Sequence, residues 1–279
     1  MGGSGTIGHR IWRTIVWILT ALFIFNLALL IASVVLDSLA SRWLGTWLPV
    51  GYTANWYGSA WDEFQLGSVL IVTLEVVIAV LLISALLGVP AAYALARRDF
   101  PGKRVALFIF LLPLIVPPFT YGIPLATVLY RYGLGGTLAG VVLANLVPAV
   151  PFVIFVLVPF VEQIDPRVEA AARVLGARTG KLFRYVLLPL LAPGILASLV
   201  LVLVRTIGLF DLTFLTSGPG TQTLVVALYY AVFAPGVRAN QSIDAMAVVY
   251  TLVSLFCLLI ALRFVDPTQI VGRAARRAR

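Results

Sequence analysis

Three ionisable side chains lie inside long apolar runs of the sequence, and they are the first candidates for chemistry. They are Glu75, Arg205 and Asp211. A charged group at the depth of a lipid bilayer costs about 3 kcal/mol or more unless it is paired or hydrated, so such residues commonly serve a pathway for ions or solutes. Arg205 and Asp211 can each be assigned to such a pathway. In the alternative, Arg205 donates to carbonyls of a neighbouring span and Asp211 caps or gates the outer end of its span. Glu75 is expected to serve a structural role or a contact with another subunit.

Two polar side chains near prolines extend this set of pathway candidates. The residues Pro113, Pro117, Pro118, Gly122 and Pro124 are expected to break one apolar run. Irregular backbone at membrane depth is tolerated where it lines a cavity. Tyr121 lies in this break, and it either faces a pathway or packs at a kink. Asn145 lies in the next run, which Pro148 and Pro151 should disturb, and it either faces the pathway or serves as a helix-packing amide.

The sequence offers little for enzyme chemistry. It holds one His and one Cys, so no Ser, His and Asp set for nucleophilic catalysis can be assembled. No His, Cys, Asp and Glu residues have the spacing of metal ligands. A G-x-x-x-x-G-K-[ST] sequence, which would cradle nucleotide phosphates, is also missing. We therefore expect no catalytic residue, no metal site and no cofactor on this chain, and a membrane-embedded enzyme is disfavoured.

The composition predicts an all-α integral membrane protein. Of the 279 residues 61% are apolar and 11% charged, whereas about a quarter of a soluble domain is charged. Apolar runs of about twenty residues are long enough to cross a bilayer. The six predicted spans are Ile15–Leu36, Ser68–Leu95, Val105–Leu129, Gly135–Val161, Gly194–Phe214 and Ala245–Val265. The run Leu224–Ala234 is too short to cross and is expected to form a short helix at the outer surface.

The distribution of Lys and Arg predicts the orientation. With both termini in the cytoplasm, sixteen of the twenty Lys and Arg residues fall in inner segments, as the positive-inside rule requires. The net charge of +9 then reflects this bias and contact with anionic lipid, and no nucleic acid is expected. The predicted organisation is a cytoplasmic tail (1–14), a first span with an outer loop (15–67), a core of five spans (68–265) and a basic cytoplasmic tail (266–279).

The inner loop between the fourth and fifth spans, residues 162–193, has the pattern of two short helices around a glycine. Asp165 and Pro166 predict a helix start, because a capping carboxylate and a proline at the first helical position favour one. Gly176 should end this helix, and a second should start near Thr179 and run to Pro189. A compact knob of this kind suits a protein partner, and the alternative is an amphipathic hairpin on the lipid surface.

This loop resembles the EAA loop of bacterial ABC importer permeases, in which E-A-A is followed by three residues, G, nine residues and I-x-L-P. Ala170 occupies the position of the glutamate, and Glu169 lies one residue early, which turns it by about 100° round a helix. Val186 replaces the isoleucine. The residues that the resemblance assigns to coupling with an ATPase are Glu169, Ala170, Ala171, Ala172, Gly176, Ala177, Leu188 and Pro189.

The resemblance extends over roughly residues 65 to 265. The stretches "GVPAAYALARRDFPGKR" and "LLPLIVPPFTYGIPL" look like permeases of the type I importer fold, with six transmembrane helices. The similarity is greatest to the spermidine/putrescine and ferric-ion group, where "VLGA" accompanies the loop and "TSGPG" follows the fifth span. It implies a bacterial inner-membrane subunit that works by alternating access. The implied partners are an ABC ATPase dimer that holds ATP and Mg, a second permease (another chain or a copy), an extracytoplasmic substrate-binding protein and the lipid membrane.

The predicted substrate is a small solute, with a polyamine favoured. Asp211, Tyr229 and Tyr230 could hold a cation through charge and cation–π contacts, whereas Arg205 would oppose a cation and suit an anion. A sugar, a ferric complex and an organic anion stay open within the same class of importer. An ion-coupled secondary transporter is the rival class, but it would need midplane carboxylates and commonly two related halves.

Overall fold

The structure is a computed structural model that describes residues 4–43, 46–233 and 238–263. Helices make up nearly all of this part, with one isolated β-bridge between Ala40 and Tyr52. The chain divides into two compact units, Met1–Gln65 with Ala231–Val249, and Leu66–Tyr230 with Tyr250–Arg279. The inner loop and all five pathway candidates belong to the second unit. The predicted basic tail at 266–279 and the end of the sixth predicted span lie outside the described residues.

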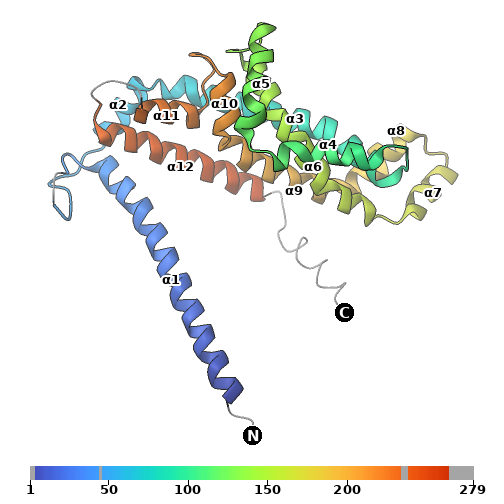
Figure 1. Ribbon diagram of the computed structural model, residues 1–279, viewed down its shortest axis with the longest axis horizontal. Coiled ribbons are helices and arrows are strands. Elements are labelled where there is room, and N and C mark those ends of the chain that lie inside the picture. Colours follow the sequence, from blue (N-terminus) through green and yellow to red (C-terminus); the bar gives the residue numbers. More distant parts are fainter. Residues whose placement is uncertain (1–3, 44–45, 234–237, 264–279) are drawn as a thin grey trace. The chain divides into compact units, whose positions relative to one another are not determined.

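Helices long and apolar enough to cross a membrane account for most of the described chain (Figure 1). Five are unbroken: α1 (Ser4–Leu39), α3 (Leu66–Arg97), α6 (Leu138–Glu162), α9 (Leu188–Ile207) and α12 (Asn240–Arg263). A sixth span exists if α4 (Lys103–Ile115) and α5 (Pro118–Arg131) count together. The predicted spans are thus confirmed as helices, with two changes described below. The short helix predicted at 224–234 is α11 (Leu224–Phe233).

In the first unit, α2 (Asn55–Glu63) folds back on the end of α1 through hydrogen bonds. The hydroxyls of Ser38 and Tyr57 lie 2.8 Å apart, and the indole N–H of Trp56 donates to the carbonyl of Ala40 at 2.8 Å. Glu63 accepts from Arg238 in an ion pair of 3.1 Å. The first two contacts tie the end of α1 to α2, and Glu63 ties α2 to Arg238 and to Ser242 in the first turn of α12 (Asn240–Arg263).

The core of the second unit is formed by α3, α6 and α9. Its buried apolar side chains include Val80, Val153, Ile154, Leu157 and Val202. The helix α6 runs from Leu138 to Glu162 with Pro148, Pro151 and Pro159 inside it. The sequence predicts that Pro148 and Pro151 disturb this span, but the helix continues through both. Neighbouring helices pack on both sides of α6, and such packing lets a membrane helix tolerate prolines.

The helices α3 and α6 approach each other closely at Gly88. A Cβ atom at this position would lie 2.6 Å from Cγ1 of Val153, so only glycine fits. We expect Gly88→Leu to lower the free energy of unfolding by about 1–3 kcal/mol, because an overpacked core must shift. The melting temperature of the purified protein, measured by fluorescence, should fall by roughly 5 °C. Leu86→Phe adds volume to an exposed position of the same helix and should change nothing; equal melting of the two variants would contradict this packing.

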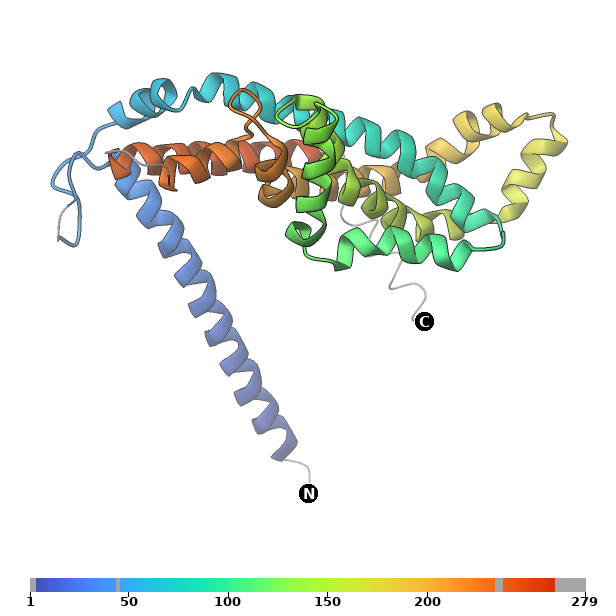
Figure 2. The ribbon, with the colours of Figure 1, turned by 45° about the horizontal axis from the view of Figure 1, so that its top comes forward.

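The prolines break the third predicted span, as the sequence indicated. The axes of α4 and α5 differ by 101°, a bend that is plain in Figure 2. Val116 and Pro117 between them are extended, both with ψ of 134°. Each of these residues precedes a proline, and a following proline disfavours helical backbone. The structure therefore confirms a break at residues 116–117. Pro113 lies inside α4, and Tyr121, Gly122 and Pro124 lie inside α5, so the prediction that Tyr121 lies in the break is wrong.

The fifth predicted span, Gly194–Phe214, is wrong at both ends. The helix α9 stops at Ile207, Leu209 is extended with ψ of 91°, and a separate α10 (Phe210–Thr216) follows. Gly208 at the break has low helix propensity. At the inner end, the helix that starts at Thr179 does not stop at Pro189 but continues through α8 (Thr179–Leu182) and a π-helical turn, η1 (Phe183–Leu187), into α9. A π turn commonly marks a functional position.

Candidate functional site

The inner loop begins and ends as its sequence predicts. Asp165 accepts a hydrogen bond from the backbone N–H of Arg167 at 2.9 Å, which caps α7 (Pro166–Val174). At the other end the backbone N–H of Gly176 donates to the carbonyl of Arg173 at 2.9 Å. The backbone N–H of Ala177 donates to the carbonyl of Ala172 at 3.0 Å. Gly176 has φ of +85°. This bonding pattern is a Schellman motif, which requires a residue in the left-handed region.

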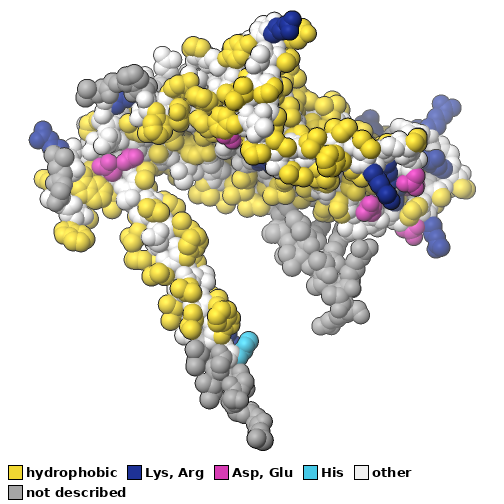
Figure 3. All heavy atoms as spheres, viewed as in Figure 1, with side chains coloured by type: hydrophobic (Ala, Val, Ile, Leu, Met, Phe, Trp, Pro, Cys, Tyr) yellow, Lys and Arg dark blue, Asp and Glu magenta, His cyan; other side chains and the backbone are white. Residues whose placement is uncertain are grey.

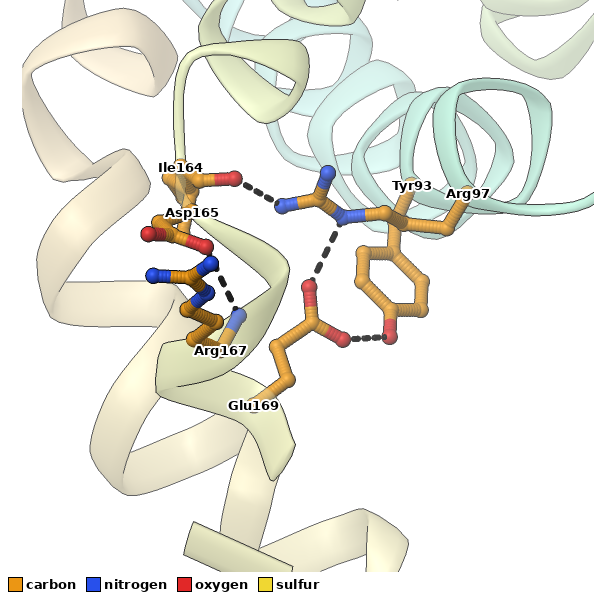
Figure 4. A network of polar contacts seen from close by, with 6 residues as sticks. All are labelled: Tyr93, Arg97, Ile164, Asp165, Arg167 and Glu169. Carbon is orange, nitrogen blue, oxygen red and sulfur yellow. Dashed lines mark hydrogen bonds and ion pairs between the residues drawn. The ribbon is translucent and has the colours of Figure 1, made fainter. Parts of the chain in front are cut away.

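Glu169 is turned toward its own chain, into a network with the end of α3 (Figure 4). Its Oε1 accepts from Nε of Arg97 at 2.7 Å, and its Oε2 accepts from the Tyr93 hydroxyl at 2.6 Å. Arg97 also donates to the carbonyl of Ile164. Tyr93 and Arg97 lie one helical turn apart, so they face the same side of α3. The network fastens the first turn of α7 to α3.

The network is largely withdrawn from solvent. Glu169 is 8% exposed, and the side chains of the ion pair are 14% and 11% exposed for Arg97 and Glu169. Removing one partner of a buried ion pair leaves an uncompensated charge and costs about 3–5 kcal/mol. Tyr93 and Arg97 were not among the predicted site residues, although both lie in the stretch "AAYALARR" that carried the family resemblance.

The other loop residues divide between an inner and an outer face. Ala172 and Ala177 pack against a buried cluster of Val161, Leu182, Leu187 and Leu191. The outward residues, called the loop tip below, are Ala170, Ala171, Arg173, Val174, Leu175 and Gly176. Val174 and Leu175 are each 88% exposed. Leu188 and Pro189 are exposed at the start of α9. The loop thus presents small and apolar side chains outward from an anchored base.

Basic side chains surround the loop tip. Figure 3 shows Lys and Arg gathered at the end of the molecule that carries α7 and α8, next to a largely apolar surface over the long helices. Arg173, Arg178, Lys181 and Arg184 are all exposed there. An apolar tip with a charged rim has the composition of a protein interface, whose core is apolar and whose rim is polar.

The break between α9 and α10 brings together three of the five pathway candidates. Arg205 lies in the last turn of α9, Asp211 in the first turn of α10, and Tyr121 on α5. Tyr121 packs against the buried cluster of Leu129, Ala144, Leu209 and Leu212, and it lies within electrostatic range of both Arg205 and Asp211. These three side chains, called the polar break below, lie where the backbone of the fifth span is irregular.

Asn145 lies beside the polar break and is buried. Its amide donates to the carbonyl of Val141 at 2.9 Å and to the hydroxyl of Thr213 on α10 at 3.1 Å. This second bond ties α10 to α6, as a helix-packing amide would. The amide oxygen has no hydrogen-bond partner within the described residues.

Glu75 is not joined to these residues. It is exposed on α3 in a stripe with Ile71, Ile78 and Leu82, and the described part of the chain gives it no hydrogen bond or ion pair. Tyr229 and Tyr230 pack instead with Phe210 and Phe214, with ring centroids 4.8–5.8 Å apart. The tyrosines proposed for cation binding therefore form an aromatic cluster on α10 and α11.

Comparison with known proteins identifies the family. Residues 84–271 match the family described as "Binding-protein-dependent transport system inner membrane component". The chain is 33% identical over 200 residues to the molybdenum transport system permease protein ModB of Haemophilus influenzae, covering 66% of this chain and 87% of that protein. It is 33% identical over 187 residues to the trehalose transport system permease protein SugB of Mycobacterium tuberculosis, covering 67% and 66%.

Solved structures agree on the fold. A chain of a bacterial ABC transporter involved in the import of the acidic polysaccharide alginate superimposes with a TM-score of 0.77 at 18% identity, covering 93% of this chain and 98% of that one. A structure of a bacterial alginate ABC transporter in complex with a periplasmic protein bound to an alginate pentasaccharide gives 0.66 at 16% identity, with 92% of both chains covered. At these sequence identities the two matches establish the fold alone.

Proposed function

This chain belongs to the family of binding-protein-dependent transport system inner membrane components, and we propose that its 166–189 loop couples solute import to a separate ATPase. It is a multi-pass protein of the bacterial inner membrane and an ABC importer permease. The observation that carries the proposal is the loop itself: an exposed tip around Gly176, held on a base that is fastened to α3 and continuous with α9.

The proposed mechanism runs from the loop tip into the spans. Both termini and the loop face the cytoplasm, so the tip lies in a cleft of an ABC ATPase, and a dimer of this ATPase holds ATP and Mg. When ATP closes the dimer, the displaced tip carries α7 with it. The Glu169–Arg97 pair passes this displacement to α3, and the continuous helix from Thr179 passes it to α9.

Two further partners belong to the proposal. One six-span chain is too small to enclose a pathway, so a second permease, another chain or a copy, completes it. An extracytoplasmic binding protein delivers the solute, which is the arrangement named for the alginate transporter with its periplasmic protein. Alternate opening to the two sides follows from rocking of the two permeases against each other.

The substrate class proposed from the relatives is an oxyanion or a sugar. The relatives reported above are named for molybdenum and trehalose transport, and neither name supports the polyamine that the sequence motifs favoured. Tyr229 and Tyr230 contribute their rings to the aromatic cluster with Phe210 and Phe214.

The test is reconstitution of this chain with its ATPase, second permease and binding protein in liposomes. We expect hydrolysis of ATP to rise several-fold when the liganded binding protein is added, and solute to accumulate only with ATP. Uptake at the normal rate without the ATPase, driven by a proton or sodium gradient, would instead establish a secondary transporter. Binding of the ATPase can be scored separately by co-purification.

A further inference from the structure

The guanidinium of Arg205 is a cation in a membrane-spanning helix, and the described residues accept no hydrogen bond from it. Its Cζ lies 5.8 Å from the centre of the Phe152 ring on α6. Over the described residues it makes no hydrogen bond and no ion pair. A guanidinium carries five N–H donors. Leaving them unmet at membrane depth is costly, so we expect them to meet acceptors that the described residues do not supply.

The surroundings of Arg205 indicate an interhelical position rather than a lipid-facing one. Phe152 packs against the core cluster of α3, α6 and α9, and Tyr121 packs against the cluster around Leu209 and Leu212. The guanidinium therefore lies over an aromatic ring that belongs to the core of α3, α6 and α9, and Arg205 is only partly exposed. Its Cζ lies over the ring of Phe152, and its N–H donors can meet a planar or tetrahedral group of oxygens.

We propose that Arg205 is the anion-binding residue of the translocation pathway and that the transported solute is an oxyanion. This inference rests on the function proposed above. The oxygens of the solute accept from the guanidinium fork. The Tyr121 hydroxyl, which donates to the carbonyl of Pro113 at 3.5 Å in this structure, turns to donate to the solute instead. Asp211 supplies the opposite charge beside them. Asp211 competes with the solute for Arg205. This competition lowers the affinity for the anion, so the anion can leave the site.

The three rival classes of substrate should also respond differently to the charges of Arg205 and Asp211. A polyamine would depend on Asp211 and be repelled by Arg205, and a neutral sugar would depend little on either charge. An oxyanion must lose binding when Arg205 is neutralised and gain it when Asp211 is neutralised. A lipid phosphate would provide the same oxygens, but it would be displaced by neither sulfate nor molybdate supplied in solution at low concentration.

The experiment uses the complete complex of permeases and ATPase, purified without its binding protein. Its melting temperature is measured with millimolar sulfate, molybdate, trehalose or spermidine at constant ionic strength. We expect sulfate or molybdate to raise the Tm by about 3 °C. This rise should disappear in Arg205→Gln, be partly kept in Arg205→Lys and grow in Asp211→Asn. Arg131→Gln removes an exposed charge at the end of α5 and should keep the full rise.

Three results would overturn the inference. An equal rise in Arg205→Gln would be a general salt effect on stability. A rise with spermidine that disappears in Asp211→Asn would establish a cation site. Loss of the second permease from the Arg205→Gln complex would show that the acceptor belongs to that partner. ATPase stimulation by the binding protein, measured on the same preparations, tests the importer proposal independently of all three.

The matching transport measurement uses the reconstituted system with its binding protein. Neutralising a charge that contacts a bound anion costs enough to weaken transport about 30-fold or more. We expect this loss for oxyanion uptake by Arg205→Gln, whereas ATPase docking persists because the loop tip is unchanged. Unaltered oxyanion uptake by this variant would contradict the site.

Discussion

Glu169→Gln should uncouple ATP hydrolysis from transport while the ATPase stays bound. The substitution keeps the shape of the side chain but removes the charge that Arg97 meets at 2.7 Å. An unpaired Arg97 at this buried position costs about 3 kcal/mol, so the base of α7 loosens from α3 although the loop tip is intact. We expect solute transported per ATP to fall at least about ten-fold, measured by parallel uptake and phosphate-release assays on the reconstituted complex.

Two comparisons make this expectation specific to the buried pair. Asp99→Asn breaks the Asp99–Lys103 ion pair, in which the Asp99 side chain is fully exposed, and it should leave transport per ATP unchanged. The double substitution Arg97→Met with Glu169→Leu replaces the pair by apolar side chains, which commonly preserves stability, and it should restore part of the coupling. Full coupling in Glu169→Gln alone would show that α7 does not act through α3.

Local patterns in the sequence were sufficient for the caps and breaks. The proline run predicted the bend before α5 because each residue that precedes a proline is driven out of the helical region. Asp165 and Gly176 predicted the two ends of α7, since capping depends on residues within one turn of the helix end. These features need no knowledge of the rest of the chain.

Contacts between distant segments could not be predicted in this way. Glu169 lies 72 residues from Arg97 and 76 from Tyr93, and the direction in which it faces is decided by where α3 packs. Apolar composition likewise continues through Gly208, so hydropathy extended the fifth span past the true end of α9. The approach of Arg205, Asp211 and Tyr121 depends on that break, which explains why only the residues and not their arrangement were foreseen.

The loop tip gives the second large effect: Gly176→Arg should remove the ATPase from the complex. A Cβ atom at this position would have nothing of this chain within 4 Å, so the side chain enters the space left for the partner. The φ of +85° adds strain of about 1–2 kcal/mol within the loop. Blocking a central contact of an interface commonly weakens it about 30-fold or more. We expect the permease to reach the membrane in normal amount and the ATPase to be lost on co-purification.

A substitution at Gly102 is the control that distinguishes blocked docking from backbone strain. It also has a positive φ, +87°, and a Cβ there would likewise have nothing within 4 Å, but it precedes α4 and lies outside the loop. Gly102→Arg therefore carries the same strain, adds the same charge and should retain the ATPase. Gly176→Ala, which adds strain with little bulk, should weaken binding only slightly. If Gly102→Arg and Gly176→Arg lose the ATPase equally, strain or charge is the cause, and the loop tip is not the place where the ATPase binds.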